Sequence, residues 1–474
     1  MQTPPPLLRH IACVFLLWTV WASSGLARQP NIVLIVADDL GWSDIACYGS
    51  EIHRTPRLDE LAKSGVRFTN AYANAPNCAP SRACLLTGLY PPRHGIYTVG
   101  SSARGKAANR RLIPTPNRTV LDEELVTLAE VLQRAGYATA SVGKWHLSDD
   151  PTRYGFGVNV GGFKAGHPKS YFSPYQNPAL ADGDDGEYLT DRLTDEAIGF
   201  LEAHRDGPFF LYLPYYTVHT PIQGRPEMVA EQRERAKHDT RIKPGYAAMV
   251  ERLDDSVGRV FDALDRLDVA ANTTVIFMSD NGGHGMYTDN APLRGSKGML
   301  YEGGIRVPLI IAGRGVSRIG EAEDIPVIGT DIFPTIVDIA GLTKQVDVML
   351  DGRSLRPLID RDAAAATNAE SEAFWDRRPL FWHFPAYLEA YRASDGHWRT
   401  TPAAAVRIGR YKLIEFFEDG RQELYDLSID PRELQDLAGS MPAQVAELSD
   451  AMRAWRRDTD APVPHDNEPG FVTE

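Results

Sequence analysis

The sequence predicts an α/β protein with a large, mainly parallel mixed sheet sandwiched by helices, and a smaller C-terminal α+β subdomain that contains an antiparallel sheet. Three observations lead to this prediction. Short apolar runs rich in β-branched residues alternate with longer segments of helical periodicity, as in βαβ units. Polar residues directly follow several of these runs, where open α/β sheets build their sites. Beyond about residue 370 the pattern changes to shorter runs separated by turns.

The elements of the large domain can be assigned in order along the chain. The run at residues 31–37 has the continuous apolar character of a strand buried on both faces. Residues 55–68 predict a capped helix followed by a short strand, and residues 150–187, rich in Gly, Pro and Asp, predict a long surface excursion. Further strands are expected at residues 137–142, 209–213, 272–278 and 309–312, and further helices at residues 126–135, 189–204, 245–267 and 331–340.

The C-terminal part is expected to form a separate unit. Residues 404–417 and 423–427 predict antiparallel strands joined by a turn at 418–421. A short helical segment should begin at Asp430 and Pro431, and a last helix should cover residues 442–457. We therefore expect a large α/β domain over residues 28–370 and a C-terminal subdomain over residues 371–474, with an Ala-rich linker near residues 363–367.

The N-terminus and the composition limit where the protein acts and what it binds. Arg9 and His10 precede an apolar run at residues 11–22, and small residues lead up to Ala27. This is typical of a signal peptide over residues 1–27, and it predicts a periplasmic or secreted protein. The run is too short to span a bilayer comfortably, so no membrane span is expected. The net charge of −13, without a Lys/Arg run, argues against a nucleic-acid partner.

Four oxygen-bearing side chains follow two of the predicted strands. Asp38 and Asp39 come directly after the first strand, and Asp280 and Asn281 come after the strand at 272–278. Adjacent carboxylates beyond a core strand are costly unless they are paired or bind a cation. Oxygen ligands suit Ca²⁺ or Mg²⁺ rather than Zn²⁺, so the sequence predicts a metal site here.

Cys78 begins a segment, Cys-Ala-Pro-Ser-Arg, that predicts the start of a helix. Pro80 fits the first turn, and Gly88 can end the helix. The Cys78 side chain would lie at the helix N-terminus, where the dipole favours an anion, so Cys78 is a plausible nucleophile. A bridge between Cys47 and Cys84 is left open, because sequence cannot establish it.

A set of cationic and imidazole groups completes the candidate site. Arg82 follows Cys78 by one helical turn, and the others come after predicted strands or in a Gly-rich loop. Together they suit a tetrahedral anionic group such as a sulfate ester, and a histidine can protonate the leaving alcohol. The remaining members are Lys144, His146, His219 and Lys297.

These segments resemble the type I, formylglycine-dependent sulfatases, arylsulfatase-like members of the alkaline-phosphatase-like superfamily. The resemblance covers residues 29 to about 440 and shows no departure at a core position. It rests on the following motifs: C-x-P-S-R at 78–82 with L-T-G at 86–88, G-K-W-H at 143–146, H-x-P at 219–221, G-x-K-G at 295–298 and Y-E-G-G-x-R-V-P at 301–308.

The resemblance implies a mechanism. A maturation enzyme would oxidise Cys78 to formylglycine, whose hydrate attacks sulfur beside Ca²⁺, with Mg²⁺ as an alternative ion. Residue 78 would be the fifth metal ligand, and Arg82 would hold the nucleophile beside the metal. Lys144 and Lys297 would hold the sulfate oxygens. His219 or Lys297 would assist departure of the alcohol, and His146 would deprotonate the second hydroxyl.

The substrate is predicted only as a class. Export and the resemblance favour a sulfated carbohydrate, such as a glycosaminoglycan or an algal galactan, with loops such as 150–187 and 371–400 setting specificity. His284 and Arg294 are candidate substrate contacts, whereas Arg306 is expected to be structural. Two other functions remain open: a phosphodiesterase or phosphonate monoester hydrolase on the same scaffold, and a non-catalytic sulfoglycan-binding protein.

Overall fold

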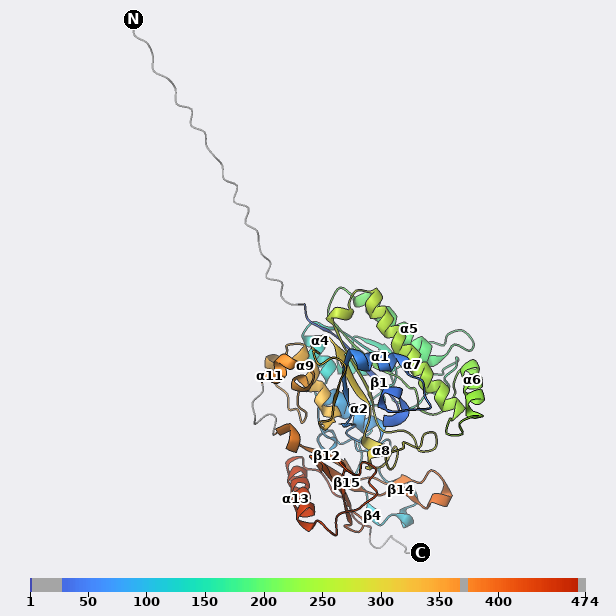
Figure 1. Cartoon of the computed structure of the whole chain (residues 1–474), viewed down its shortest axis with the longest axis vertical. Helices are drawn as coiled ribbons and strands as arrows, with labels where there is room; N and C mark the ends of the chain where they lie inside the picture. The colour runs from blue at the N-terminus through green and yellow to red at the C-terminus, as the bar shows by residue number, and fades with distance from the viewer. Residues whose placement is uncertain (2–27, 367–373, 468–474) are drawn as a thin grey trace.

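The computed structural model describes Met1 and residues 28–366 and 374–467. The predicted signal peptide and the predicted domain boundary at 370/371 lie outside the described residues, apart from Met1. Among the described helices, none combines the length and apolar character needed to cross a membrane. Figure 1 shows a large helix-covered sheet and, below it, a smaller C-terminal layer.

The large sheet confirms the predicted α/β architecture. Its eight strands lie in the order β10-β2-β9-β8-β1-β7-β5-β6. Strand β9 alone among them runs antiparallel to its neighbours, β8 and β2. The strands are β1 (Asn31–Ala37), β2 (Gly65–Phe68), β5 (Ala138–Val142), β6 (Val158–Val160), β7 (Phe209–Pro214), β8 (Thr273–Ser279), β9 (Leu309–Gly313) and β10 (Glu321–Glu323).

Strand β1 lies at the centre of the sheet and faces a hydrophobic core on each side. Ile32 and Leu34 face one core, whereas Val33 and Ile35 face the other. This burial on both faces is why the strand has no polar alternation in its sequence. Helices α2 (Cys78–Thr87), α4 (Leu128–Arg134) and α9 (Ile332–Ile339) contribute to the first core; α1 (Pro56–Ser64), α5 (Leu189–His204) and α7 (Pro244–Arg266) contribute to the second.

The segment at 150–187 differs from the expected surface excursion. It contains β6, which forms one edge of the large sheet, and it buries Tyr171 and Tyr175 in the second core. The packing of these aromatic rings outweighs the turn-rich composition. Only part of the segment, including Gly166 and His167, lines a pocket.

The C-terminal layer is an antiparallel sheet in the order β12-β15-β16-β17, which confirms the predicted antiparallel sheet. The run expected as one strand at 404–417 is a hairpin, because the chain reverses after Gly409, whose φ is +55°. Asp430 and Pro431 lie in a turn rather than a helical segment. The elements are β12 (Pro379–Phe384), β15 (Ala403–Ile408), β16 (Tyr411–Phe416), β17 (Gln422–Asp426) and helix α13 (Pro442–Asp458).

A small hairpin joins this layer to the predicted site. Strands β13 (Leu388–Glu389) and β14 (Trp398–Thr400) pair with each other. The Tyr387 backbone N–H donates to the Ser102 carbonyl at 3.0 Å, and the Trp398 indole donates to the Asn109 carbonyl at 3.1 Å. The hairpin is therefore anchored to the loop at residues 99–111 of the large domain.

Candidate active site

Parallel pairing of β1 and β8 brings the predicted metal ligands together. Ala37 is in register with Ser279, so the residues that follow the two strands meet at one sheet edge. The Asp39 backbone N–H donates to Asp280 Oδ1 at 3.3 Å, and Asn281 Nδ2 donates to Asp39 Oδ1 at 2.9 Å. Asp38 and Asp280 are also buried, so burial concentrates three carboxylates in this small space.

Helix α2 directs Cys78 and Arg82 at these carboxylates. The helix begins at Cys78 and ends at Gly88, whose φ is +70°, as the sequence predicted. Cys78 Sγ lies 3.4 Å from Asp38 Oδ1 and 3.8 Å from Asp39 Oδ1. Arg82 is fully buried, and its Nε donates to Asp280 Oδ2 at 2.9 Å. The guanidinium thus neutralises one of the three carboxylates.

Two lysines neutralise the other carboxylates. Lys144 Nζ donates to Asp38 Oδ2 at 2.6 Å. Lys297 Nζ donates to Asp39 Oδ2 at 2.7 Å and lies 3.4 Å from Cys78 Sγ. With Arg82, three cations match the three carboxylates. A bound divalent cation would leave a net positive charge for an anionic substrate and an ionised nucleophile.

Burial and these charges shift the pKa values in opposite directions. Burial raises the pKa of Asp38 well above its ordinary value, in spite of Lys144. Burial also acts to raise the pKa of Asp39, but Lys297, His219 and Lys144 outweigh it and lower that pKa. The pKa of Lys297 is raised, because Asp39 and Cys78 outweigh the effect of burial. Asp39 and Lys297 therefore form a charged pair.

The two predicted histidines also lie in this site. His219 Nε2 is 3.6 Å from Asp39 Oδ2, and its Nδ1 is 2.9 Å from the Thr220 carbonyl, to which it donates. His146 Nδ1 is buried without a hydrogen-bond partner among the described residues. Burial is the largest cause that lowers the pKa of both rings. Neutral imidazoles are thus favoured at both positions.

Two residues of the site have left-handed backbone conformations. The φ angle is +60° at Asp39 and +65° at His146. Non-glycine residues seldom adopt this region, and such outliers gather at functional sites. The surrounding packing holds both side chains in place. A Cβ on Gly166, for example, would lie 2.3 Å from His146 Cε1.

The donor set fits a hard divalent cation. Ligand atoms of Asp38, Asp39, Cys78 and His219 lie within 4.8 Å of one another, and Asn281 Oδ1 is buried without a hydrogen-bond partner among the described residues. The oxygen donors of Asp38, Asp39 and Asn281 in this set suit Ca²⁺ or Mg²⁺. His219 belongs to this group, whereas Asp280 is turned toward Arg82.

A pocket of about 310 Å³ lies beside the candidate metal site. Cys78, His146, His219 and Lys297 line it, and so does His284, a candidate substrate contact. Arg294 does not line it. Its guanidinium stacks on Tyr301 at 3.9 Å and donates to the Tyr425 hydroxyl at 2.9 Å.

Comparison with known proteins decides the family. The sulfatase family model matches residues 30–342. The chain belongs to the sulfatase family. It is therefore a sulfuric ester hydrolase, and a second model, for the C-terminal region of N-sulphoglucosamine sulphohydrolase, matches residues 294–458 of this sulfatase.

Individual relatives agree with the family. A sulfatase from Formosa agariphila is 34% identical over 92% of this chain and 90% of its own length. Mouse steryl-sulfatase is 31% identical over 96% of this chain and 87% of its own length. The crystal structure of Ps i-CgsB in complex with k-i-k-neocarrahexaose has a TM-score of 0.73 and 28% identity, covering 94% of this chain and 95% of that one.

Some pocket residues of the sulfatase were not foreseen from the sequence. They lie in loops or in the short strands β13 and β14, which are too short to show a periodicity in the sequence. The segments 150–187 and 371–400 were expected to influence specificity, but single residues within them could not be chosen. The residues missed are Arg104, His167, Leu388 and Arg399.

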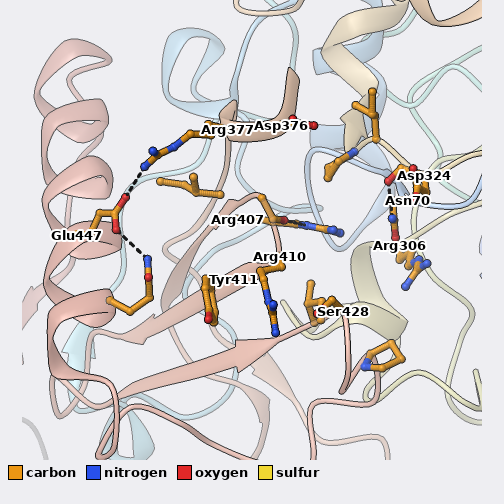
Figure 2. Close-up of a pocket in the computed structure, with 17 residues that line it drawn as sticks. Asn70, Arg306, Asp324, Asp376, Arg377, Arg407, Arg410, Tyr411, Ser428 and Glu447 are labelled. Atoms are coloured by element: carbon orange, nitrogen blue, oxygen red, sulfur yellow. Dashed lines mark hydrogen bonds and ion pairs between the residues drawn. The ribbon is translucent and has the colours of Figure 1, made fainter. Parts of the chain in front are cut away.

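A larger cavity of about 780 Å³ lies at the seam between the large domain and the C-terminal sheet (Figure 2). Its arginines already have protein partners. Arg377 pairs with Glu447 at 3.1 Å, Arg407 donates to the Gly409 carbonyl at 2.9 Å, and Arg306 donates to the Thr69 carbonyl at 2.8 Å. Arg306 thus has the structural contacts expected of it, and the 310 Å³ pocket is the better candidate for substrate.

Proposed function

We propose that this sulfatase hydrolyses sulfate esters of a sulfated carbohydrate, such as a fragment of a glycosaminoglycan or an algal galactan, at a formylglycine derived from Cys78. The observation that carries the proposal is the position of Cys78. It lies at the start of α2, within 3.4 Å of both Asp38 Oδ1 and Lys297 Nζ. An inert core cysteine would instead be surrounded by apolar side chains.

The nucleophile and the metal are both part of the proposal. A formylglycine-generating or equivalent maturation enzyme would replace the thiol of Cys78 by an aldehyde, and the hydrate of that aldehyde supplies an attacking hydroxyl. Asp38, Asp39, Asp280, Asn281 and residue 78 would hold Ca²⁺, or Mg²⁺ in its place. When bound, the ion supplies positive charge beside the nucleophile and the sulfate.

The cationic side chains would bind the sulfate group. Lys144 and Lys297 each reach the site with an ammonium group on an Asp carboxylate. Both can donate hydrogen bonds to sulfate oxygens, because an ammonium carries three protons. Arg82 would keep the position of residue 78 fixed through Asp280.

The histidines would move protons. His219 donates from Nδ1 to the Thr220 carbonyl, so Nε2 of the neutral ring is unprotonated. Nε2 would first take up a proton from solvent, beside Asp39 Oδ2 at 3.6 Å, and would then deliver that proton to the leaving alcohol. Lys297 is engaged by Asp39 and Cys78, which favours His219 over Lys297 for this step. The buried Nδ1 of His146, which has no hydrogen-bond partner in the described part of the chain, suits a base that accepts the proton of the second hydroxyl at residue 78.

The substrate class is supported by the structure of Ps i-CgsB, which holds the sugar oligomer k-i-k-neocarrahexaose. The predicted signal peptide supports the same class, since an exported enzyme meets extracellular glycans. Export would place the mature protein in the periplasm or outside the cell, after cleavage near Ala27.

The proposal is tested by mass spectrometry and turnover on protein from its natural host. The tryptic peptide with residue 78 should be lighter than its cysteine form by about 18 Da, the difference between thiol and aldehyde. Cys78→Ala should abolish hydrolysis of aryl and sugar sulfates, whereas Cys84→Ala, a buried cysteine on the same helix, should retain it. An unmodified Cys78 thiol in the active protein would refute the proposed nucleophile.

Turnover of a panel of substrates distinguishes the sulfatase proposal from the two alternative functions. The panel should contain sulfated sugars, steryl sulfate, and matched aryl sulfates, phosphate diesters and phosphonates. Faster turnover of the phosphorus esters would favour the phosphonate or phosphodiester hydrolase. Calcium-dependent glycan binding without turnover would favour the binding protein.

A further inference from the structure

We propose that Arg104 and Arg399 form a second anion-binding subsite beside the catalytic pocket, which recognises a carboxylate or a second sulfate near the scissile sulfate ester. The inference rests on the proposed carbohydrate substrate and narrows it to sugars or disaccharides with two anionic groups. Both arginines line the same pocket as Cys78 and Lys297.

Arg399 is coupled to the catalytic lysine through one aromatic ring. The Tyr391 hydroxyl donates to the Lys297 carbonyl at 3.1 Å, and the Arg399 guanidinium lies 4.0 Å from the centroid of the Tyr391 ring. His284 packs against that ring, with centroids 4.5 Å apart. Arg399 is thereby held one ring away from the backbone of Lys297, and both side chains line the same pocket.

The backbone leaves room for this arrangement. A Cβ on Gly298, whose φ is +91°, would lie 2.9 Å from Arg399 Nε. A Cβ on Gly105, whose φ is +69°, would lie 2.5 Å from the Trp398 ring. Gly105 allows the loop at 99–111 to approach strand β14 closely, and Gly298 allows the segment after Lys297 to pack against Arg399. The Arg104 guanidinium is held by a hydrogen bond that its Nη2 donates to the Val99 carbonyl.

The two guanidinium groups lack an acidic partner of their own. Neither forms an ion pair with another described residue, and Arg399 Nε is buried without a hydrogen-bond partner among them. Burial and the charge of Arg399 lower the pKa of Arg104, with only Glu389, an exposed residue, opposing them. Two like charges held together in this way are stabilised by a bound anion.

The experiment measures binding rather than turnover, so that it stands apart from the proposed chemistry. In a Cys78→Ala background, calorimetry should compare galactose 6-sulfate, galactose 2,6-disulfate, and a disaccharide of glucuronate with N-acetylgalactosamine 6-sulfate. We expect at least one dianionic ligand to bind about tenfold tighter than the monosulfated sugar, as charge-assisted hydrogen bonds would give. Which of the two binds tighter identifies the second anion.

Arginine variants locate the effect. Arg104→Gln and Arg399→Gln should bring the affinity ratio close to one, and Arg399→Lys should restore part of it. Arg392→Gln removes the same charge from an exposed position in the same hairpin and should keep the ratio. A ratio near one in the parent protein, or an equal loss in Arg392→Gln, would overturn the inference. Failure of the proposed function would be seen separately, as absence of sulfate ester turnover when Cys78 is present.

Discussion

At the scale of single residues, Arg82 is the side chain on which the charge balance of the site depends most. It is fully buried and lies 2.8 Å from Asp280 and 3.9 Å from Asp38. Removing one partner of a buried ion pair leaves a charge without compensation, and this is far more costly than removing an exposed pair.

Replacing Arg82 by Met should therefore lower the free energy of unfolding by about 3–5 kcal/mol and abolish turnover. Arg54→Met is the control, because Arg54 and Glu231 form an exposed pair and its loss should cost about 0–1 kcal/mol. Urea titration followed by circular dichroism measures both values. Equal stability of the two variants would contradict the assigned role of Arg82.

Calcium should stabilise the folded protein by binding to its proposed ligands, among them Asn281. At a calcium concentration of 100 times Kd, binding to the folded state adds about 2.7 kcal/mol. Differential scanning fluorimetry should show a Tm that falls with EGTA and recovers with Ca²⁺. Asn281→Ala should reduce this shift, because it removes the buried Oδ1, which no other described residue hydrogen-bonds. A full shift in the variant would exclude Asn281 as a ligand.

Most charged groups of the site could be predicted from sequence because they follow a strand or lie in the first turn of a helix, whereas Lys297 lies in a Gly-rich loop and was indicated by the G-x-K-G motif. Asp38 and Asp280 follow paired strands, so their proximity is a consequence of the sheet. Arg294 seemed equivalent because it is close to Lys297 in sequence, yet its side chain is turned toward Tyr425. Arg104 and Arg399 could not be predicted, since only tertiary packing brings their loops together.

At the scale of elements, helix α2 shows how a local signal fixes the position of Cys78, the proposed nucleophile. Asn77 caps the helix with an extended backbone, so that Cys78 is its first residue, and Gly88 ends it in a left-handed conformation. Gly88 is also in close contact: a Cβ there would lie 2.5 Å from Leu350 Cδ2.

Gly88→Ala should consequently be destabilising, by more than the roughly 1 kcal/mol typical of alanine at positive φ. Gly199→Ala provides the matched contrast, since Gly199 lies inside α5 with no atom within 4 Å of an added Cβ. That variant should gain about 0.5–1 kcal/mol. Chemical denaturation compares the two, and a stabilised Gly88→Ala protein would contradict the steric argument.

Elements with strong periodicity were predicted well, and those decided by tertiary packing were not. Helix α5 has the bounds expected from its apolar spacing, and β1 those expected from its apolar run. The sequence predicts a single strand where the hairpin at Gly409 lies, because the β-branched pattern continues on both sides of the turn. Strand β6 was missed, because its residues are half-buried at a sheet edge.

At the scale of the whole molecule, a buried ion cluster connects the two layers. Lys412, in β16, contacts Glu302 and Glu433 at 2.9 Å each, and all three side chains are fully buried. Glu302 begins the short helix α8 (Glu302–Ile305) of the large domain. The cluster therefore couples the C-terminal sheet to the segment that follows Lys297.

Replacing Lys412 by Met should lower the free energy of unfolding by about 3–5 kcal/mol, because two buried carboxylates lose their cation. The C-terminal layer should become more sensitive to limited proteolysis. Lys237→Met, which breaks an exposed pair with Glu234, should leave both properties nearly unchanged. Unaltered proteolysis of Lys412→Met would show that the cluster does not couple the layers.

The molecule should also lose stability in acid through its buried histidines. Burial lowers the pKa of His383 from 6.5 to about 4. Above pH 6.5 neither state binds this proton, but between pH 6.5 and 4 the unfolded chain binds it and the folded protein does not. Stability should fall in that window by about 1.4 kcal/mol per pH unit for this group.

His383→Gln should reduce that slope, as measured by urea denaturation at several pH values. The exposed His238 supplies the control, and His238→Gln should retain the slope of the parent. An unchanged slope in His383→Gln would mean that other groups determine the acid sensitivity.

The hairpin of β13 and β14 has a consequence for how such proteins diversify. The groups proposed to handle the sulfate are all encoded upstream of Gly298, whereas Leu388 and Arg399 come from a later stretch of the gene. After gene duplication, one copy can therefore change in this hairpin while the codons for the charged residues proposed to bind the sulfate stay unchanged. Paralogues can then diverge in the glycan that they select and keep one inherited chemistry.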